Sequence, residues 1–218
     1  MIALHGFLGL PQDWSDFGYD AVDLWKRVTP LEEWANSFVA EVEGQPWLLG
    51  YSMGGRLAMH AALAKPEAFG GLILVSANPG IVMESERAMR LRSDGVWARR
   101  FREDPWDEVL RDWNAQPVLK GSALERPEDA FDREALAKAM DVWSLGRQRD
   151  LRKELLSLEI PVLHVVGEED AKFSQMMSGL ELPPTQSLNV IEKAGHRVPW
   201  DQPEAFKSAV AEFREFFG

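Results

Sequence analysis

The sequence predicts an α/β protein with one mostly parallel sheet of about six strands and helices on both faces of that sheet. Three apolar segments, at residues 46–50, 71–75 and 161–167, are bounded by proline or glycine, as expected for strands buried on both faces. Residues 22–24 and 188–191 are weaker strand candidates. Stretches with helical spacing of apolar residues separate these segments, and such alternation of strands and helices is typical of a parallel sheet.

Two helices have recognisable starts. Thr29 offers a capping hydroxyl before Pro30, and apolar residues then recur at helical spacing up to residue 42. Asp201 stands in the equivalent place before a proline that begins the last apolar-periodic stretch, residues 203–217. We therefore expect Thr29 and Asp201 to cap these two helices.

A long interval, from about residue 79 to residue 158, contains no convincing strand and is rich in arginine and tryptophan. We expect a helical cap inserted between two strands of the sheet, with residues 1–78 and 159–218 forming the core. The alternative is a solvated helical face with ordinary buried tryptophans, which explains part of this composition.

The strongest chemical signal is the sequence Gly-Tyr-Ser-Met-Gly-Gly at residues 50–55, between an apolar strand and an alanine-rich helix. Glycines two positions on either side of Ser52 allow the strand and the helix to approach closely, which pushes the serine hydroxyl above the sheet. The Met53 backbone N–H then lies at a helix N-terminus, where it can stabilise an oxyanion. We predict that Ser52 is the catalytic nucleophile or base.

A serine hydroxyl needs an adjacent base, and the sequence has four histidines. His60 lies in the helix after Ser52 and His164 lies within a buried strand, so both are expected to be structural. His5 begins a loop after the first strand. His196 follows the last strand, at the carboxyl end of the sheet, and is the predicted base.

The acid and the second oxyanion donor are expected in two further loops. Glu168, Glu169 and Asp170 follow the strand at residues 161–167, and Asp170 is favoured because the order Ser, Asp, His then has one residue per loop. The loop at residues 5–9 contains two glycines, so we expect the Phe7 backbone N–H to complete the oxyanion hole with Met53.

Composition excludes several classes of function. The chain has 218 residues, 45% of them hydrophobic, which suffices for one sizeable core. It carries 24 Lys and Arg against 35 Asp and Glu, a net charge of −11 that disfavours nucleic acid and anionic membranes as partners. The chain contains no cysteine and its histidines are scattered, so we expect no metal and no cofactor. No apolar run is long enough to span a bilayer, and we expect a cytoplasmic protein.

These motifs together resemble the α/β-hydrolase superfamily, at residues 4–7, 50–55 and 194–196. Within it the chain resembles the 2-succinyl-6-hydroxy-2,4-cyclohexadiene-1-carboxylate synthases of menaquinone biosynthesis. Five segments carry this second likeness: residues 50–56, 78–80, 86–94, 112–118 and 167–173. The resemblance implies the α/β-hydrolase fold with a helical cap. The chain departs from the pattern at Asn114, where the family has tyrosine. It also departs at residues 76–78, where the family has Gly-Gly-His and this chain has Ser-Ala-Asn.

The resemblance implies a carbon–oxygen lyase in which Ser52 acts as the base and pyruvate leaves a small cyclohexene substrate that carries several carboxylates. Such an anion requires arginines that grip carboxylates, because the protein is negative overall. Arg56 lies one helical turn after Ser52. The substrate-binding residues expected from the likeness are Tyr51, Arg56, Arg87, Arg90, Arg92, Trp113 and, as a further clamp, Arg126.

Two alternatives stay open at the level of sequence. A carboxylesterase or thioesterase would use the same triad through an acyl-serine intermediate, since fold and triad serve many chemistries. The other alternative is an inactive scaffold that binds a small molecule or a protein. The arginines in the predicted cap favour the lyase, because an esterase for apolar acyl chains gains nothing from desolvating cations. The sequence does not indicate the oligomeric state.

Overall fold

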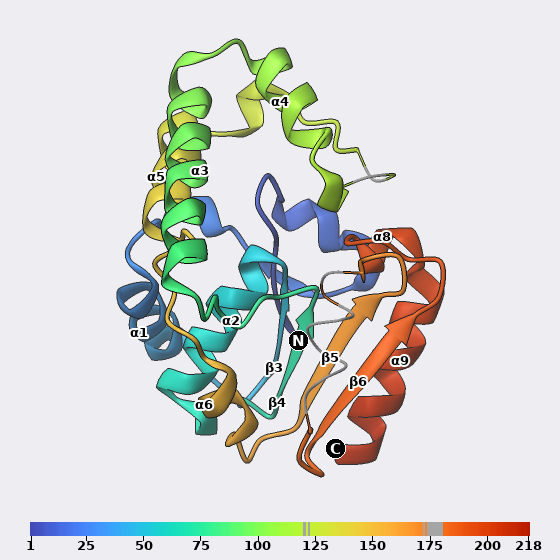
Figure 1. The fold of residues 1–218 in the computed structure, drawn as a ribbon. Helices are drawn as coiled ribbons and strands as arrows, with labels where there is room; N and C mark the ends of the chain where they lie inside the picture. The colour runs from blue at the N-terminus through green and yellow to red at the C-terminus, as the bar shows by residue number, and fades with distance from the viewer. Residues whose placement is uncertain (120, 122, 172, 174–180) are drawn as a thin grey trace.

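A computed structural model describes residues 1–119, 121, 123–171, 173 and 181–218 (Figure 1). Within these residues a six-stranded sheet has the order β2-β1-β3-β4-β5-β6, and every neighbouring pair is parallel. The strands are β1 (Ile2–Leu4), β2 (Asp20–Val22), β3 (Trp47–Tyr51), β4 (Gly71–Val75), β5 (Val162–Gly167) and β6 (Gln186–Ile191). The predicted fold class is confirmed.

The strand expected at residues 22–24 is displaced. β2 ends at Val22, and Asp23 instead caps a short 3-10 helix, Leu24–Lys26, by accepting a hydrogen bond from the Trp25 backbone N–H at 3.1 Å. Leu24 is fully buried, so its apolar character reflects burial in this turn and not strand pairing.

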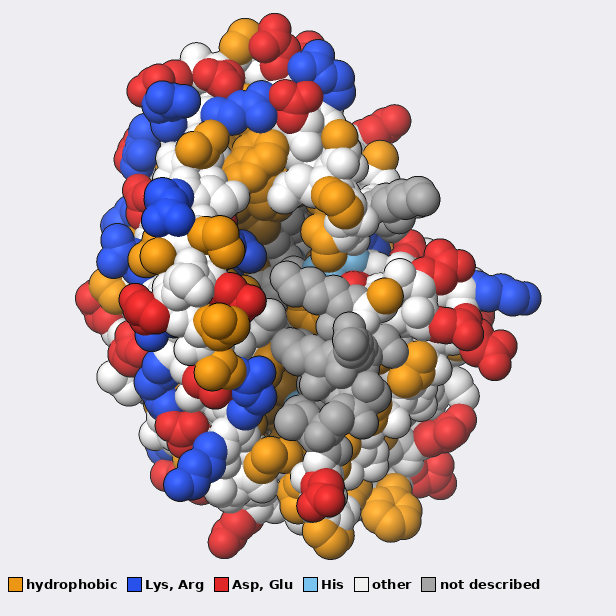
Figure 2. Space-filling view, viewed as in Figure 1, with side chains coloured by type: hydrophobic (Ala, Val, Ile, Leu, Met, Phe, Trp, Pro, Cys, Tyr) orange, Lys and Arg blue, Asp and Glu red, His pale blue; other side chains and the backbone are white. Residues whose placement is uncertain are grey.

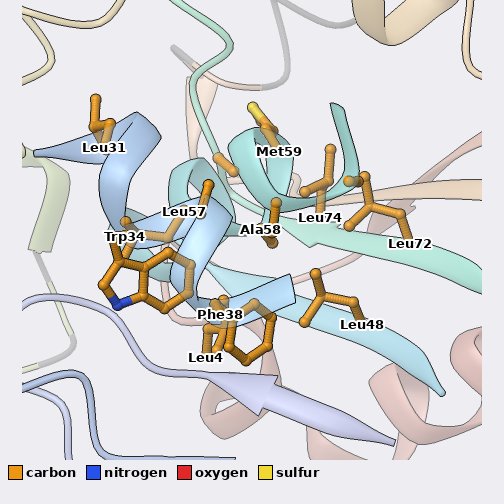
Figure 3. Packing of buried hydrophobic residues seen from close by; sticks show 14 of the residues in the cluster. Leu4, Leu31, Trp34, Phe38, Leu48, Leu57, Ala58, Met59, Leu72 and Leu74 are labelled. Carbon is orange, nitrogen blue, oxygen red and sulfur yellow. The ribbon is translucent and has the colours of Figure 1, made fainter. Parts of the chain in front are cut away.

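Alternate residues of the strands face two hydrophobic layers. Leu48 and Leu72 pack with α1 (Leu31–Glu41) and α2 (Met53–Ala64) on one face, where Trp34 and Phe38 fill the space between helix and sheet (Figure 3). Leu49 and its neighbours pack on the other face, against α8 (Val198–Asp201) and α9 (Pro203–Phe217). The sheet is therefore buried on both faces, as its continuous apolar strands predicted.

Both predicted helix caps are wrong. Pro30 occupies the N-cap position of α1, so Thr29 lies one residue too early. The Thr29 hydroxyl has no hydrogen-bond partner in the described ranges. Gln202 occupies the N-cap position of α9, while the Asp201 carboxylate accepts a hydrogen bond from the Gly195 backbone N–H at 2.9 Å.

Between β4 and β5 the described residues form four α-helices: α3 (Glu84–Glu103), α4 (Trp106–Asn114), α5 (Arg133–Val142) and α6 (Arg152–Leu156). In Figure 1, α3, α4 and α5 rise beyond the carboxyl ends of the strands. Their own apolar cluster includes Phe101, Trp106 and Leu136, and it meets the rest of the protein at Leu8. Among the described helices, none is long and apolar enough to cross a bilayer.

Three buried histidines predict that acid destabilises the fold. Burial lowers the pKa of His5, His60 and His164 from 6.5 to about 4. Between these values the unfolded chain binds protons that the folded chain does not, so the free energy of unfolding should fall as pH decreases from about 6.5 to about 4. Urea unfolding at pH 7.0 and 5.5 measures this change.

The matched control for this prediction is His164→Gln, which removes one titrating group from β5 while keeping a polar side chain beside Gln186. Its unfolding midpoint should depend less steeply on pH than that of the wild-type protein. Equal slopes for the two proteins between pH 7.0 and 5.5 would contradict the prediction.

Candidate active site

Ser52 occupies a strained turn between β3 and α2, with a φ of 52° and a ψ of −111°. An L-residue rarely adopts this conformation, and here close packing enforces it. A Cβ added to Gly50 would lie 2.5 Å from the Gly54 carbonyl oxygen, and one added to Gly54 would lie 2.4 Å from the Leu4 carbonyl oxygen. Glycine at both positions therefore lets α2 press against the sheet, with Ser52 at the carboxyl end of β3.

His196 and Asp170 come to Ser52 from two other strand ends. The His196 Nε2 lies 3.0 Å from the Ser52 Oγ, and the His196 Nδ1 lies 2.6 Å from Asp170 Oδ2. Asp170 follows β5 and His196 follows β6, and both side chains are buried. With Nδ1–H donating to the carboxylate, Nε2 is free to accept the serine proton, which is the arrangement of a general base.

The three carboxylates that were candidates for the acid occupy different environments. Glu168 is exposed and accepts a hydrogen bond from the Lys193 backbone N–H at 3.2 Å, and Glu169 is exposed as well. Asp170 is the one that contacts His196. Of these three carboxylates the structure places Asp170 against His196, and its role as the acid stays a prediction.

The loop after β1 is held by the imidazole of His5. The Gly6 carbonyl oxygen accepts hydrogen bonds from His5 Nδ1–H at 2.8 Å and from the Gly9 backbone N–H at 3.0 Å. The Leu24 backbone N–H donates to His5 Nε2, so Nδ1 carries the proton, and burial keeps the ring neutral by lowering its pKa to about 4. Because the peptide is trans, the Phe7 N–H points away from these donors.

The same loop lies directly against the tight turn at residues 50–55, which is called the elbow from here on. A Cβ added to Gly6 would lie 3.5 Å from the Ser52 Cβ and 2.7 Å from the Tyr51 ring. Phe7 and Met53, the two residues whose N–H groups are predicted to form the oxyanion hole, both line the cavity described below. The sequence identified the loop by its glycines but missed the role of His5 in orienting it.

A cavity of about 240 Å³ opens above Ser52, between the sheet and the helices α3 to α5. Hydrophobic side chains gather on the wall of this hollow in Figure 2. Its lining includes nine of the predicted site residues: Phe7, Tyr51, Ser52, Met53, Arg56, Arg90, Trp113, Arg126 and His196.

Arg87 and Arg92, two of the predicted substrate contacts, are not brought to the cavity. Arg87 donates to the Gly146 carbonyl oxygen at 3.2 Å and pairs with Glu84, and Arg92 is exposed. Of the three arginines of α3 predicted to bind substrate, the structure thus places Arg90 alone in the cavity lining. The face of α3 that lines the cavity follows the helical period, with residues 90, 93, 94 and 97.

Two arginines in the cavity are held by different partners. Arg56 is buried, and its Nη1 donates to Gln148 Oε1 at 3.4 Å. Burial and, after it, the charge of Arg90 lower the pKa of Arg56 to about 9, while Asp94 raises it. Arg90 donates through Nε to both Asp94 oxygens, at 2.7 and 2.8 Å, and Ser144 donates to the same carboxylate. The two Nη groups of Arg90 form no hydrogen bond within the described ranges.

The other predicted contacts occupy an aromatic part of the cavity. Tyr51 packs against His196 and Trp200, and burial raises the pKa of its hydroxyl. Trp113 packs against Phe7, with ring centroids 4.7 Å apart. Asn114 is not in the cavity lining; its amide donates to and accepts from the Leu124 backbone at 2.9 Å, so it fixes a loop.

Sequence reasoning missed four further polar residues of the cavity and its surroundings. Asp94 lies four residues after Arg90, a spacing that signals a helical ion pair. Gln148 and Asp13 have no local signal, because their partners are distant in the chain. Ser76 lines the cavity beside the elbow with a φ of 46°, and its buried hydroxyl has no partner among the residues that the structure describes. In the same residues no cluster of three His, Asp or Glu could hold a metal.

Comparison with known proteins gives the family of this chain. Residues 2–209 match the alpha/beta hydrolase family. The chain is 32% identical to the 2-succinyl-6-hydroxy-2,4-cyclohexadiene-1-carboxylate synthase of Citrobacter koseri, over 97% of this chain and 92% of the relative. It is 36% identical to the synthase of the same name from Serratia proteamaculans, over 78% and 67% of the two chains.

Two solved structures share the fold. MenH from S. aureus superposes with a TM-score of 0.88 at 22% identity, covering 99% of this chain and 93% of that protein. A thermophilic esterase from Thermogutta terrifontis superposes with a TM-score of 0.71 at 22% identity, covering 99% and 89%. At this identity both likenesses describe the fold alone.

The close packing at the elbow predicts opposite effects for two glycine substitutions. Gly54→Ala should destabilise the protein by about 1–3 kcal/mol or more, because the new Cβ overlaps backbone atoms at the end of β1. Gly95→Ala is the matched control, since a Cβ at this position of α3 meets nothing within 4 Å. It should stabilise α3 by up to about 1 kcal/mol. Urea denaturation measures both, and equal effects would contradict the packing argument.

Proposed function

This chain belongs to the alpha/beta hydrolase family and, within it, to the 2-succinyl-6-hydroxy-2,4-cyclohexadiene-1-carboxylate synthases, and we propose that it catalyses that synthase reaction in menaquinone biosynthesis. The reaction is an elimination in which pyruvate leaves a cyclohexene substrate carrying several carboxylates. The observation that carries the proposal is the pair of arginines, Arg56 and Arg90, in the cavity above Ser52. They supply positive charge where a polycarboxylate must bind.

In the proposed mechanism Ser52 is the base. Asp170 holds the imidazole of His196, and His196 Nε2 draws the proton from the Ser52 hydroxyl. The serine oxygen then removes a proton from a ring carbon and becomes a hydroxyl again, the electron pair forms a new ring double bond, and the carbon–oxygen bond breaks with its electrons on the leaving enolpyruvate. The proton held by His196 passes to this leaving group, which becomes pyruvate. The Phe7 and Met53 N–H groups stabilise the negative charge that develops on the conjugated substrate oxygen.

The partners of the two arginines support an anionic substrate. Arg56 is buried against a neutral amide and forms no ion pair in the described part of the chain, and with a pKa of about 9 it is protonated at neutral pH. A buried cation without an anion is costly, and a substrate carboxylate removes that cost. Arg90 is anchored through Nε, which leaves its Nη edge for a second carboxylate. An esterase for apolar acyl chains would not benefit from this arrangement.

The decisive test is a coupled assay for pyruvate released from the cyclohexene substrate, run beside hydrolysis of p-nitrophenyl acetate. The wild-type protein should release pyruvate, and Ser52→Ala should lower kcat by about 10³-fold or more with an unchanged circular dichroism spectrum. Rapid ester hydrolysis without pyruvate release would replace the lyase by the carboxylesterase alternative.

Two arginines of α3 allow a matched test of substrate binding. Arg90→Ala should raise KM and lower kcat/KM by about 10–100-fold, because one charge-assisted contact to a carboxylate is worth about 1.5–3 kcal/mol. Arg92→Ala removes an exposed guanidinium from the same helix and should leave kcat/KM within about twofold. Steady-state kinetics separate the two, and similar losses in both variants would refute the assignment of Arg90.

A further inference from the structure

Arg126 lies between α4 and α5, and its guanidinium reaches the loop that follows β1. Its Nε donates to the Leu8 carbonyl oxygen at 2.7 Å, and its Nη2 donates to both Asp13 oxygens at 2.8 and 2.6 Å. Each of the two charged side chains is 14% exposed. This ion pair is therefore largely shielded from water, which makes its loss more costly than that of a surface pair.

Three side chains, those of Arg126, Trp25 and Asp13, hold three consecutive residues of this loop. Arg126 binds the Leu8 carbonyl, the Trp25 indole N–H donates to the Gly9 carbonyl at 2.8 Å, and Asp13 accepts from the Leu10 N–H at 2.9 Å. Leu8 is fully buried with a φ of 56°, a conformation that costs a leucine about 1 kcal/mol or more. Such a conformation persists where surrounding contacts enforce it, and Arg126 supplies one of them.

Arg126 is also fixed at its backbone. The Trp106 indole N–H, at the start of α4, donates to the Arg126 carbonyl oxygen at 2.7 Å. Beside this polar junction, Phe7 packs against Phe101 and Trp113, with ring centroids 5.1 and 4.7 Å apart. The segment between β4 and β5 thus contacts the loop in two ways. Its aromatic side chains pack against Phe7, and Arg126 binds the Leu8 carbonyl and the Asp13 carboxylate.

We infer that Arg126 and Asp13 form a latch, the ion pair together with its bond to Leu8, that positions the Phe7 N–H for the developing oxyanion. The inference rests on the proposed function, in which Phe7 is an oxyanion donor. Arg126 is then a positioning residue and not the substrate clamp that the sequence suggested. Turning its Nε and Nη2 toward a substrate would leave the Asp13 carboxylate and the Leu8 carbonyl without this donor, a cost that Arg56 does not face.

Kinetics distinguish a latch from a clamp. Arg126→Ala and Asp13→Ala should each lower kcat by about 10–100-fold with KM changed less than about threefold, because a displaced oxyanion donor affects the transition state. The double variant should be no worse than the more severe single variant, since both remove one interaction. A rise in KM of about tenfold for Arg126→Ala, with kcat unchanged and Asp13→Ala near wild type, would overturn the inference.

A second readout does not depend on the substrate. The rate at which a fluorophosphonate captures Ser52 also depends on the oxyanion donors, but the reagent carries no carboxylate. It should fall in both latch variants and stay unchanged in Arg92→Ala, which removes an exposed guanidinium outside the cavity lining. Capture at the wild-type rate in the latch variants would refute the latch. Slower capture in the latch variants of a protein that releases no pyruvate would support the latch while rejecting the lyase.

Two controls keep folding separate from positioning. Arg133→Ala removes a guanidinium that binds the Phe101 and Asp104 carbonyl oxygens within the helical segment and does not contact the loop after β1. It should lower the melting temperature while leaving kcat of the folded protein unchanged. If Arg126→Ala does not fold, Arg126→Lys is used, which keeps the charge near Asp13 and loses the forked geometry. It should show an intermediate kcat, and a wild-type kcat in this variant would count against the latch.

Discussion

At Ser52 the chain leaves β3 and enters α2 with a positive φ, and it can do so because Gly50 and Gly54 carry no side chain. Gly54 lets α2 pack directly against the end of β1, and a Cβ at this position would force the two apart. The elbow therefore also determines how closely the loop after β1 approaches the serine. His196 and Asp170 then reach the serine from the ends of β6 and β5. A parallel sheet places all these strand ends at one edge.

Charge in the cavity is organised against the field of the whole molecule. The chain has a net charge of −11, yet Arg56 and Arg90 lie close enough for the charge of one to depress the pKa of the other. Asp94 reduces this repulsion and anchors Arg90 by its Nε edge. The site thus combines a high density of positive charge with side chains that are held before a substrate arrives, which lowers the entropic cost of binding.

Arg56, Arg90 and Arg126 line the same cavity, and the hydrogen-bond partner of each guanidinium decides whether it can bind an anion. Arg56 has a neutral amide partner and Arg90 has unbound Nη groups, so both can receive an anion. Arg126 already bonds to a carboxylate and a carbonyl, so its charge is used within the protein. In the proposed mechanism the helical segment between β4 and β5 contributes to the cavity in two ways, through Arg90, which binds the substrate, and through Arg126, which positions the loop after β1.

Local patterns in the sequence determined the parallel sheet, the glycine elbow around Ser52 and the loops that bear Asp170 and His196, because strand burial and a tight turn are encoded within a few residues. Side-chain partners were not encoded in this way. Arg92 lies on a face of α3 that does not line the cavity. The ion pair of Arg126 with Asp13 joins residues 113 positions apart in the chain. Such choices depend on how a packed helix is rotated and on which distant backbone lies beside it, and the tertiary structure alone decides both.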